Sequence, residues 1–285
     1  MEVVTRHLPE VPRWLADFGA TSMHEYKSGV CLADLAGYGH PVRHELMVQL
    51  AEFFARLASV PVSELPPLSA DRPAPGDSTA FLRWRVDWTE QRVRRANEDR
   101  LDGLFEAFGV PADALESFER RLPVLTARPF CLLHTDVHRA NVVVYGSRIT
   151  VIDWELALYG DPLHDLATHL VRMEYDEEER ERMVKLWSEA MNGAGLGDMT
   201  AGLDDDLPVH LAFEYAQSVF PDLMRAALTL PPAPGDADFA AAAWRMCRSV
   251  RRAAGPLGLV SVPDEEEAAE ALSRWWRGSG GRVGR

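Results

Sequence analysis

The spacing of apolar residues predicts that most of this chain is helical. Between residues 41 and 58, Leu46, Leu50, Phe53 and Leu57 recur at intervals of three and four, which places them on one helix face. We also expect helices at about residues 79–108, 111–125, 162–173, 177–192, 207–228, 236–254 and 264–277. The Pro-rich segment 62–77 and the Gly- and Pro-rich turns between the later helices are typical of loops.

Short apolar runs interrupt this helical pattern in the middle of the chain. PFCLLH, NVVVY and ITVIDW are rich in β-branched or apolar residues, and Gly146-Ser147 separates the last two. This pattern predicts strands, with a tight hairpin between the second and the third. A further short strand is expected within residues 21–29, ending in a turn at Ser28-Gly29. The chain is therefore expected to be α+β, with a small β-hairpin among many helices.

The predicted hairpin would bring three polar side chains together. The segment contains His134-x-Asp136-x-x-x-x-Asn141, and Asp153 follows Asn141 after twelve residues. Phosphoryl transfer from ATP requires a carboxylate beside the attacking hydroxyl, and oxygen ligands that hold Mg²⁺ against the phosphates. Asp136 fits the first requirement, while Asn141 and Asp153 supply hard oxygens of the kind that Mg²⁺ prefers.

These motifs resemble a known family. H-x-D-x-x-x-x-N, followed by a hydrophobic strand and I-D-W-E, is similar to the catalytic and metal loops of the aminoglycoside phosphotransferase and choline kinase-like family. Gly160-Asp161-Pro162-x-x-Asp165 and His24-Glu25-Tyr26-x-x-Gly29 also resemble that family, so the likeness runs from about residue 11 to residue 175. It implies a protein-kinase-like (PKL) α+β fold with a mostly helical C-terminal lobe.

The resemblance also implies roles for individual residues. Asp136 would be the catalytic base, and Asn141 and Asp153 the ligands of Mg²⁺. His134 and Asp165 would support the catalytic loop. Main-chain groups of the hinge would bind the adenine of ATP, or the base of GTP, and acidic residues near the C-terminal helices would hold amino groups of the acceptor. The hinge residues are Glu25, Tyr26 and Lys27, and the acidic candidates are Glu174, Asp205, Glu214 and Asp222.

The sequence departs from the family pattern at several places. Thr135 stands where glycine is usual, and Arg139-Ala140 where proline and glycine often occur. The family has a longer segment before the hinge, which includes a Gly-rich hairpin and a phosphate-gripping lysine or arginine. We therefore expect a truncated N-lobe. The expected domains are 1–28 as a remnant of the N-lobe and hinge, 29–277 as the helical C-lobe with the catalytic and metal loops at 131–167, and 278–285 as a disordered tail.

Composition narrows the classes of partner. The net charge of −14 argues against nucleic acid as a partner, because phosphate backbones attract basic surfaces, and it could favour a cationic substrate. Cys31, Cys131 and Cys247 are widely spaced and odd in number, which favours free thiols in the cytoplasm over a disulfide framework or a zinc site. No apolar run approaches the roughly 18 residues that would predict a membrane span.

The leading hypothesis is an ATP- and Mg²⁺-dependent phosphotransferase that acts on a hydroxyl of a small molecule, such as an aminoglycoside, an amino sugar or a similar alcohol. The alternative is a non-catalytic kinase-like binding or regulatory module, or a fragment, that lost the phosphate-gripping N-lobe. A kinase acting on a peptide side chain is less favoured, because nothing resembles a protein-kinase activation segment. The sequence leaves open the acceptor, the choice between ATP and GTP, and the oligomeric state.

Overall fold

The computed structural model describes residues 2–8, 11–19, 21–67, 71–101 and 103–278, which form two compact units. The first unit contains Met1–Phe81 and Leu125–His210, and the second contains Leu82–Val124 and Leu211–Arg285. Within the tail predicted at 278–285, residues 279–285 lie outside the described part of the chain. The domain boundaries expected from the resemblance stay a prediction.

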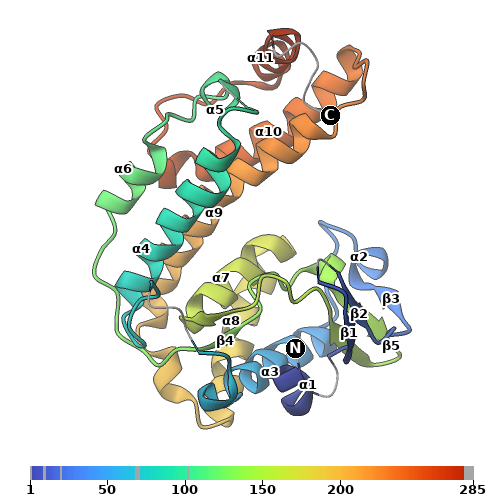
Figure 1. Ribbon diagram of the computed structural model, residues 1–285, viewed down its shortest axis with the longest axis vertical. Helices are drawn as coiled ribbons and strands as arrows, with labels where there is room; N and C mark the ends of the chain where they lie inside the picture. Colours follow the sequence, from blue (N-terminus) through green and yellow to red (C-terminus); the bar gives the residue numbers. More distant parts are fainter. Residues whose placement is uncertain (1, 9–10, 20, 68–70, 102, 279–285) are drawn as a thin grey trace. The chain divides into compact units, whose positions relative to one another are not determined.

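The first unit combines short helices with three small sheets (Figure 1). Its longest complete helices are α3 (His44–Ala58), α7 (Pro162–Met173) and α8 (Glu177–Gly193), and α3 packs against α8. The predicted apolar face of α3 is buried, including Leu46, Leu50 and Phe53. The shorter α1 (Glu2–His7) and α2 (Leu32–Leu35) and the first parts of α4 (Ser78–Thr89) and α9 (Leu203–Leu228) also belong to this unit.

The strands of the first unit are all antiparallel. β1 (Trp14–Asp17) pairs with β2 (Ser22–His24), and β4 (Cys131–Leu133) pairs with β7 (Leu158–Gly160). The predicted hairpin is confirmed, because β5 (Val142–Tyr145) and β6 (Arg148–Val151) pair across the Gly146-Ser147 turn. β3 (Val30–Cys31) lies on the other side of β5. Just before β3, Gly29 has a φ of +150°, and a Cβ there would come within 2.6 Å of Val143 and Val144.

The second unit is helical. Besides the rest of α4 and α9, it contains α5 (Leu104–Ala107), α6 (Ala114–Arg120), α10 (Asp236–Leu257) and α11 (Glu265–Gly278). α11 packs against α10 and α5, and α6 lies against α10. Edge-to-face packing of Phe105 on Phe220, with ring centroids 5.2 Å apart, joins α5 to α9 in the core of this unit.

The prediction of one continuous helix over residues 79–108 was wrong. α4 ends at Thr89, a π-helical turn covers Glu90–Arg94, and a 3-10 turn covers Arg95–Asn97. Gly103, the residue directly before α5, adopts a left-handed φ of +72°, which glycine reaches without strain. The apolar periodicity persists across this break because the residues after it, including Leu104 and Phe105, still pack into the core.

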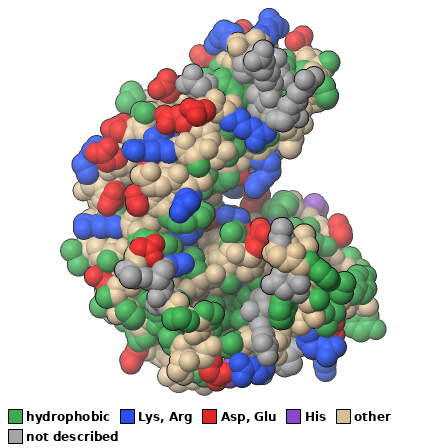
Figure 2. Space-filling model, in the orientation of Figure 1, with side chains coloured by type: hydrophobic (Ala, Val, Ile, Leu, Met, Phe, Trp, Pro, Cys, Tyr) green, Lys and Arg blue, Asp and Glu red, His purple; other side chains and the backbone are tan. Residues whose placement is uncertain are grey.

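Charged side chains of both signs share one face of the protein (Figure 2). Acidic and basic side chains are interspersed on the face drawn in Figure 2, so the net charge of −14 is not gathered there into one acidic field. Within the described ranges, no helix combines the length and the apolar character needed to cross a membrane.

Candidate active site

The predicted catalytic loop connects β4 to β5, and His134 fixes its start. The Nδ1 atom of His134 accepts the backbone N–H of Asp136 at 3.2 Å, so the proton of the neutral ring resides on Nε2, which lies 3.1 Å from the carbonyl oxygen of Ile152. Burial lowers the pKa of His134 to about 4, so the ring is neutral near pH 7. This one side chain therefore ties the loop to the residue before Asp153.

Asp165, in α7, holds the same loop through hydrogen bonds to its backbone. It lies in the first turn of α7, and its two carboxylate oxygens accept the backbone N–H groups of His134 at 2.8 Å and Thr135 at 2.7 Å. Burial raises the pKa of Asp165 to about 6, although these two hydrogen bonds favour the ionised form. The two N–H groups would otherwise be buried without acceptors, because both residues lie in the core.

Thr135 adopts an unusual backbone conformation. Its φ is +62°, in the left-handed region that β-branched residues rarely occupy. Glycine, the residue that the family resemblance leads one to expect here, would adopt this φ without strain. The Oγ1 atom of Thr135 donates a hydrogen bond of 2.8 Å to the carbonyl of Leu156, which partly offsets the strain.

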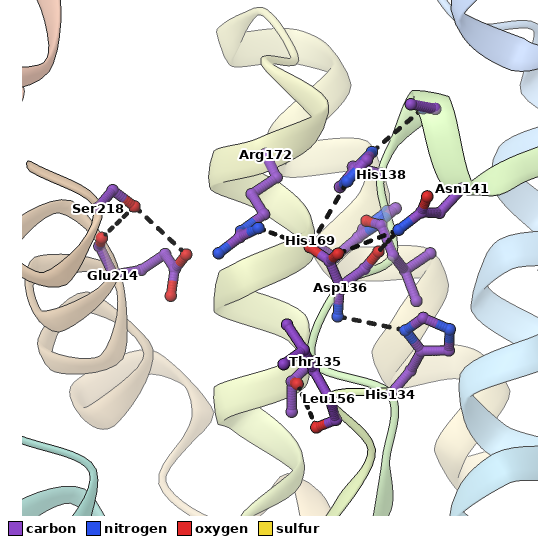
Figure 3. A network of polar contacts seen from close by, with 12 residues as sticks. His134, Thr135, Asp136, His138, Asn141, Leu156, His169, Arg172, Glu214 and Ser218 are labelled. Carbon is purple, nitrogen blue, oxygen red and sulfur yellow. Dashed lines mark hydrogen bonds and ion pairs between the residues drawn. The ribbon is translucent and has the colours of Figure 1, made fainter. Parts of the chain in front are cut away.

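Asp136 sits among three polar partners (Figure 3). Its Oδ1 lies 2.5 Å from Nη1 of Arg172 and 3.5 Å from Nε2 of His138, and its Oδ2 accepts the side-chain amide of Asn141 at 3.1 Å. Burial would raise the pKa of Asp136, but the hydrogen bond from His138 and the charge of Arg172 outweigh it, and the pKa is lowered. The side chain is therefore ionised near pH 7.

Asn141 is oriented by its contacts with Asp136. Its Nδ2 donates both to the carbonyl oxygen of Asp136 at 3.0 Å and to the carboxylate at 3.1 Å. Both of these partners are acceptors, so the amide nitrogen must face Asp136 and the amide oxygen must face away from it. The backbone of Asn141 also pairs with Ile152 at 2.9 Å, which brings the end of β6 next to the catalytic loop.

Asp153 follows β6 and lines a cavity. Its φ is +65°, and its side chain is exposed. Among the described residues, no hydrogen bond or ion pair holds its carboxylate. The cavity has a volume of about 720 Å³ and includes the predicted hinge residues in its wall. Its lining residues are Pro12, His24, Glu25, Tyr26, Lys27, Gly29, Cys31, Val143, Ile152, Asp153, Trp154 and Glu155.

The hinge side of the cavity carries a small ionic cluster. Glu25 lies 3.1 Å from Nζ of Lys27 and 3.3 Å from Nε of Arg13. The hydrogen bonds from Lys27 and from the backbone of Arg13 lower the pKa of Glu25. The backbone N–H of Glu25 donates to the carbonyl of Arg13, which anchors the segment after β2 to the start of β1.

The four acidic residues predicted to hold the acceptor lie in different places. Glu174 ends α7 with a φ of +50°, and Asp205 is exposed in the first turn of α9, both in the first unit. Glu214 is buried in the second unit and accepts the amide of Gln217. Asp222, in the same unit, accepts the hydroxyl of Ser249 at 2.9 Å. Their role in binding an acceptor stays a prediction.

Sequence reasoning missed Arg172 and His138 as partners of Asp136. Arg172 lies seven residues after Asp165 on α7, so both face the catalytic loop from the same side of that helix. The seven-residue spacing from Asp165 could have indicated that Arg172 lies near the catalytic loop. His138 precedes a 3-10 turn, Arg139–Asn141, and its Nδ1 accepts the N–H of Ala140 at 3.1 Å, which leaves Nε2 to face Asp136.

Three solved structures share this fold. A choline/ethanolamine kinase family protein from Mesorhizobium loti matches with a TM-score of 0.53 and 18% identity over 96% of this chain and 80% of its own. An ethanolamine kinase from Plasmodium vivax gives 0.56 and 12% over 89% and 69%, and a choline kinase from Streptococcus pneumoniae gives 0.52 and 17% over 89% and 78%. The chain is therefore similar to proteins of the protein-kinase-like fold, as predicted.

A search of curated proteins found no significant match. The sequence pattern of the phosphotransferase enzyme family, in contrast, matches residues 1–199, which include the hinge, the catalytic loop, Asp153 and Asp165. The match covers well over half of the chain, and it agrees with the motifs and with the fold. This protein belongs to the phosphotransferase enzyme family.

Proposed function

We propose that this protein is a kinase that transfers a phosphoryl group from ATP, with Mg²⁺, to a hydroxyl of a small molecule. One observation carries the proposal. One loop contains both Asp136 and Asn141, whose side chains are hydrogen-bonded to each other. The end of β6 is hydrogen-bonded to this loop, and Asp153, which follows β6, lines a cavity together with the hinge residues. These are the positions that phosphoryl transfer needs to fill with a proton acceptor, metal ligands and a nucleotide.

Asp136 is proposed as the group that orients the acceptor hydroxyl and takes its proton. Arg172 and His138 keep its pKa low, so the carboxylate is available as a base near pH 7. Oδ1 faces Arg172 and Oδ2 faces Asn141, so an acceptor hydroxyl would bind an oxygen that already has one of these two partners. Because Arg172 and Asn141 hold the carboxylate, its direction would stay fixed when the acceptor binds.

Asn141 and Asp153 are proposed to hold Mg²⁺. Their chemistry fits this ion, since the amide oxygen of Asn141 faces away from Asp136 and the side chain of Asp153 is exposed. Bound there, Mg²⁺ would neutralise charge on the phosphates. The protein's own part is to keep these two ligands in register, which the hydrogen bond between Ile152 N–H and the carbonyl of Asn141 does at 2.9 Å.

The cavity is proposed as the nucleotide site. Its volume of about 720 Å³ lies within the roughly 300–1,000 Å³ typical of small-molecule sites. Main-chain groups of Glu25, Tyr26 and Lys27 would bind the base of ATP or GTP. His134 and Asp165 would act indirectly, by keeping the loop in place.

The acceptor is proposed to be an alcohol such as an aminoglycoside, an amino sugar or a smaller amino alcohol. The names of the similar structures refer to choline and ethanolamine kinases, and the net charge of −14 favours a cationic molecule. Glu174, Asp205, Glu214 and Asp222 remain the candidates for contacts with its amino groups. The three cysteines are free thiols, in keeping with a reaction in the cytoplasm.

The test is release of ADP from MgATP with a panel of amino alcohols, amino sugars and aminoglycosides. Asp136→Asn should abolish turnover while sparing the fold, and Asp204→Asn, at an exposed position on α9, should match wild type. Retention of more than about a tenth of the rate in Asp136→Asn would refute the assignment of the base. Millimolar MgATP should also raise the melting temperature, since it binds the folded state. No shift would favour the non-catalytic binding module instead.

A further inference from the structure

Arg139 occupies an unusual position in the catalytic loop. It lies between Asp136 and Asn141, where proteins of this kind often carry proline, and its side chain is fully buried. A buried guanidinium keeps its charge, so its surroundings must replace the water that it lost. Those surroundings are polar backbone groups from two other segments of the first unit.

The guanidinium of Arg139 joins the ends of two helices. Its Nε donates to the carbonyl of Met173 at 2.8 Å, at the last residue of α7. Its Nη1 reaches three carbonyl oxygens in the segment that follows α2, belonging to Ala36 at 2.7 Å, Gly37 at 3.0 Å and His40 at 2.8 Å. In the described part of the chain no carboxylate pairs with Arg139, so carbonyl dipoles at the C-terminal end of α7 and after α2 compensate its charge through Nε and Nη1, while the buried Nη2 has no hydrogen-bond partner.

Two further contacts act on the same turn. The ring of Tyr38 lies 5.8 Å from the guanidinium carbon of Arg139, in the same segment after α2. From the side of β3, the thiol of Cys31 donates to the carbonyls of Arg139 and Ala140, each at 3.2 Å. The 3-10 turn that ends at Asn141 is therefore held by its backbone on one side and by the Arg139 side chain on the other.

We propose that Arg139 is a positioning residue, whose bonds to α7 and to the segment after α2 fix the turn that presents Asn141 to Asp136. Its catalytic consequence rests on the function proposed above. A proline would restrain this turn locally through its own φ, whereas Arg139 restrains it from outside through carbonyl oxygens more than thirty residues away in sequence. Precision matters here, because a displacement of about 1 Å in a catalytic group can cost roughly a hundredfold in rate.

The experiment compares Arg139→Met and Arg139→Lys with Arg94→Met. Arg94 is a second buried arginine, in the other unit, which pairs with Glu90, so Arg94→Met controls for the loss of a buried guanidinium. In Arg139→Met we expect kcat to fall about 10- to 100-fold per folded molecule and the Mg²⁺ concentration for half-maximal rate to rise, with little change in the KM of the acceptor. Lysine offers one nitrogen instead of a fork, so Arg139→Lys should fold well and restore only part of kcat.

Hydrogen exchange tests the geometry independently of activity. Amides in residues 136–141 should exchange faster in Arg139→Met than in wild type, and should be unchanged in Arg94→Met. Wild-type exchange in this segment for both Arg139 variants, or equal losses of kcat in Arg139→Met and Arg94→Met, would overturn the proposal. If the wild-type protein transfers no phosphate to any acceptor, the proposed function fails, and the exchange result alone still decides the role of Arg139.

Discussion

The backbone at Thr135 offers a sharp test of the site's construction. Replacing Thr135 by glycine relieves the left-handed φ of +62°, while replacing it by alanine leaves an L-residue in that conformation. Both changes remove the hydrogen bond from Oγ1 to Leu156 and the buried methyl group. The difference in stability between the two variants therefore isolates the backbone term.

The magnitude follows from four contributions. Loss of the hydrogen bond costs about 1 kcal/mol and loss of the buried methyl about 0.8 kcal/mol, in both variants. In Thr135→Gly the relief of left-handed strain restores roughly 1–2 kcal/mol of stability, whereas the greater freedom of the unfolded chain lowers stability by about 0.4–1 kcal/mol. Thr135→Gly should therefore be more stable than Thr135→Ala by about 0.8 kcal/mol, the middle of a range of roughly 0–1.6 kcal/mol, and both should be less stable than wild type.

Urea unfolding of the three proteins, followed by far-UV circular dichroism, measures this difference. Thr150 in β6, which has a negative φ, supplies the control. There the order should reverse, with alanine more stable than glycine by about 0.5–1 kcal/mol. A Thr135→Gly variant less stable than Thr135→Ala would refute the strain argument, because it would mean that the left-handed conformation costs less than the freedom that glycine adds.

Three other changes test the remaining supports of the site. Asp153→Asn keeps a residue that tolerates a positive φ, so the fold should persist while the Mg²⁺ concentration for half-maximal rate rises at least about tenfold; an unchanged Mg²⁺ dependence would contradict the metal role. His134 in the folded protein resists protonation, so it should cost wild type roughly 3 kcal/mol in free energy of unfolding as the pH falls from 6.5 to about 4. His134→Gln should lack this loss, and parallel curves of unfolding free energy against pH for the two proteins would disprove the linkage. Arg128→Met leaves the buried carboxylates of Asp161 and Asp206 without their cation and should lower the free energy of unfolding in urea by about 3–5 kcal/mol; a loss below about 1 kcal/mol would show that the pairs contribute little.

Much of the helical content and the central hairpin could be predicted from the sequence. α3, α7 and the β5–β6 hairpin follow the expected ranges closely, because apolar spacing and the Gly146-Ser147 turn act over a few residues. The break after α4 was not predictable by the same rule, since the buried side chains that follow it, Leu101, Leu104 and Phe108, keep a helical spacing of three and four.

The sequence by itself determined how Asp136, Asn141 and Asp153 are connected, because the first two share one short loop and a tight hairpin leads to the third. Only the tertiary structure decided what surrounds them: the approach of Arg172 to Asp136, the burial of Arg139 against carbonyls beyond α2, and the cavity shared by the hinge and Asp153. Those contacts join residues far apart in the chain. Their geometry depends on how whole helices and strands pack, and no local pattern of residues encodes it.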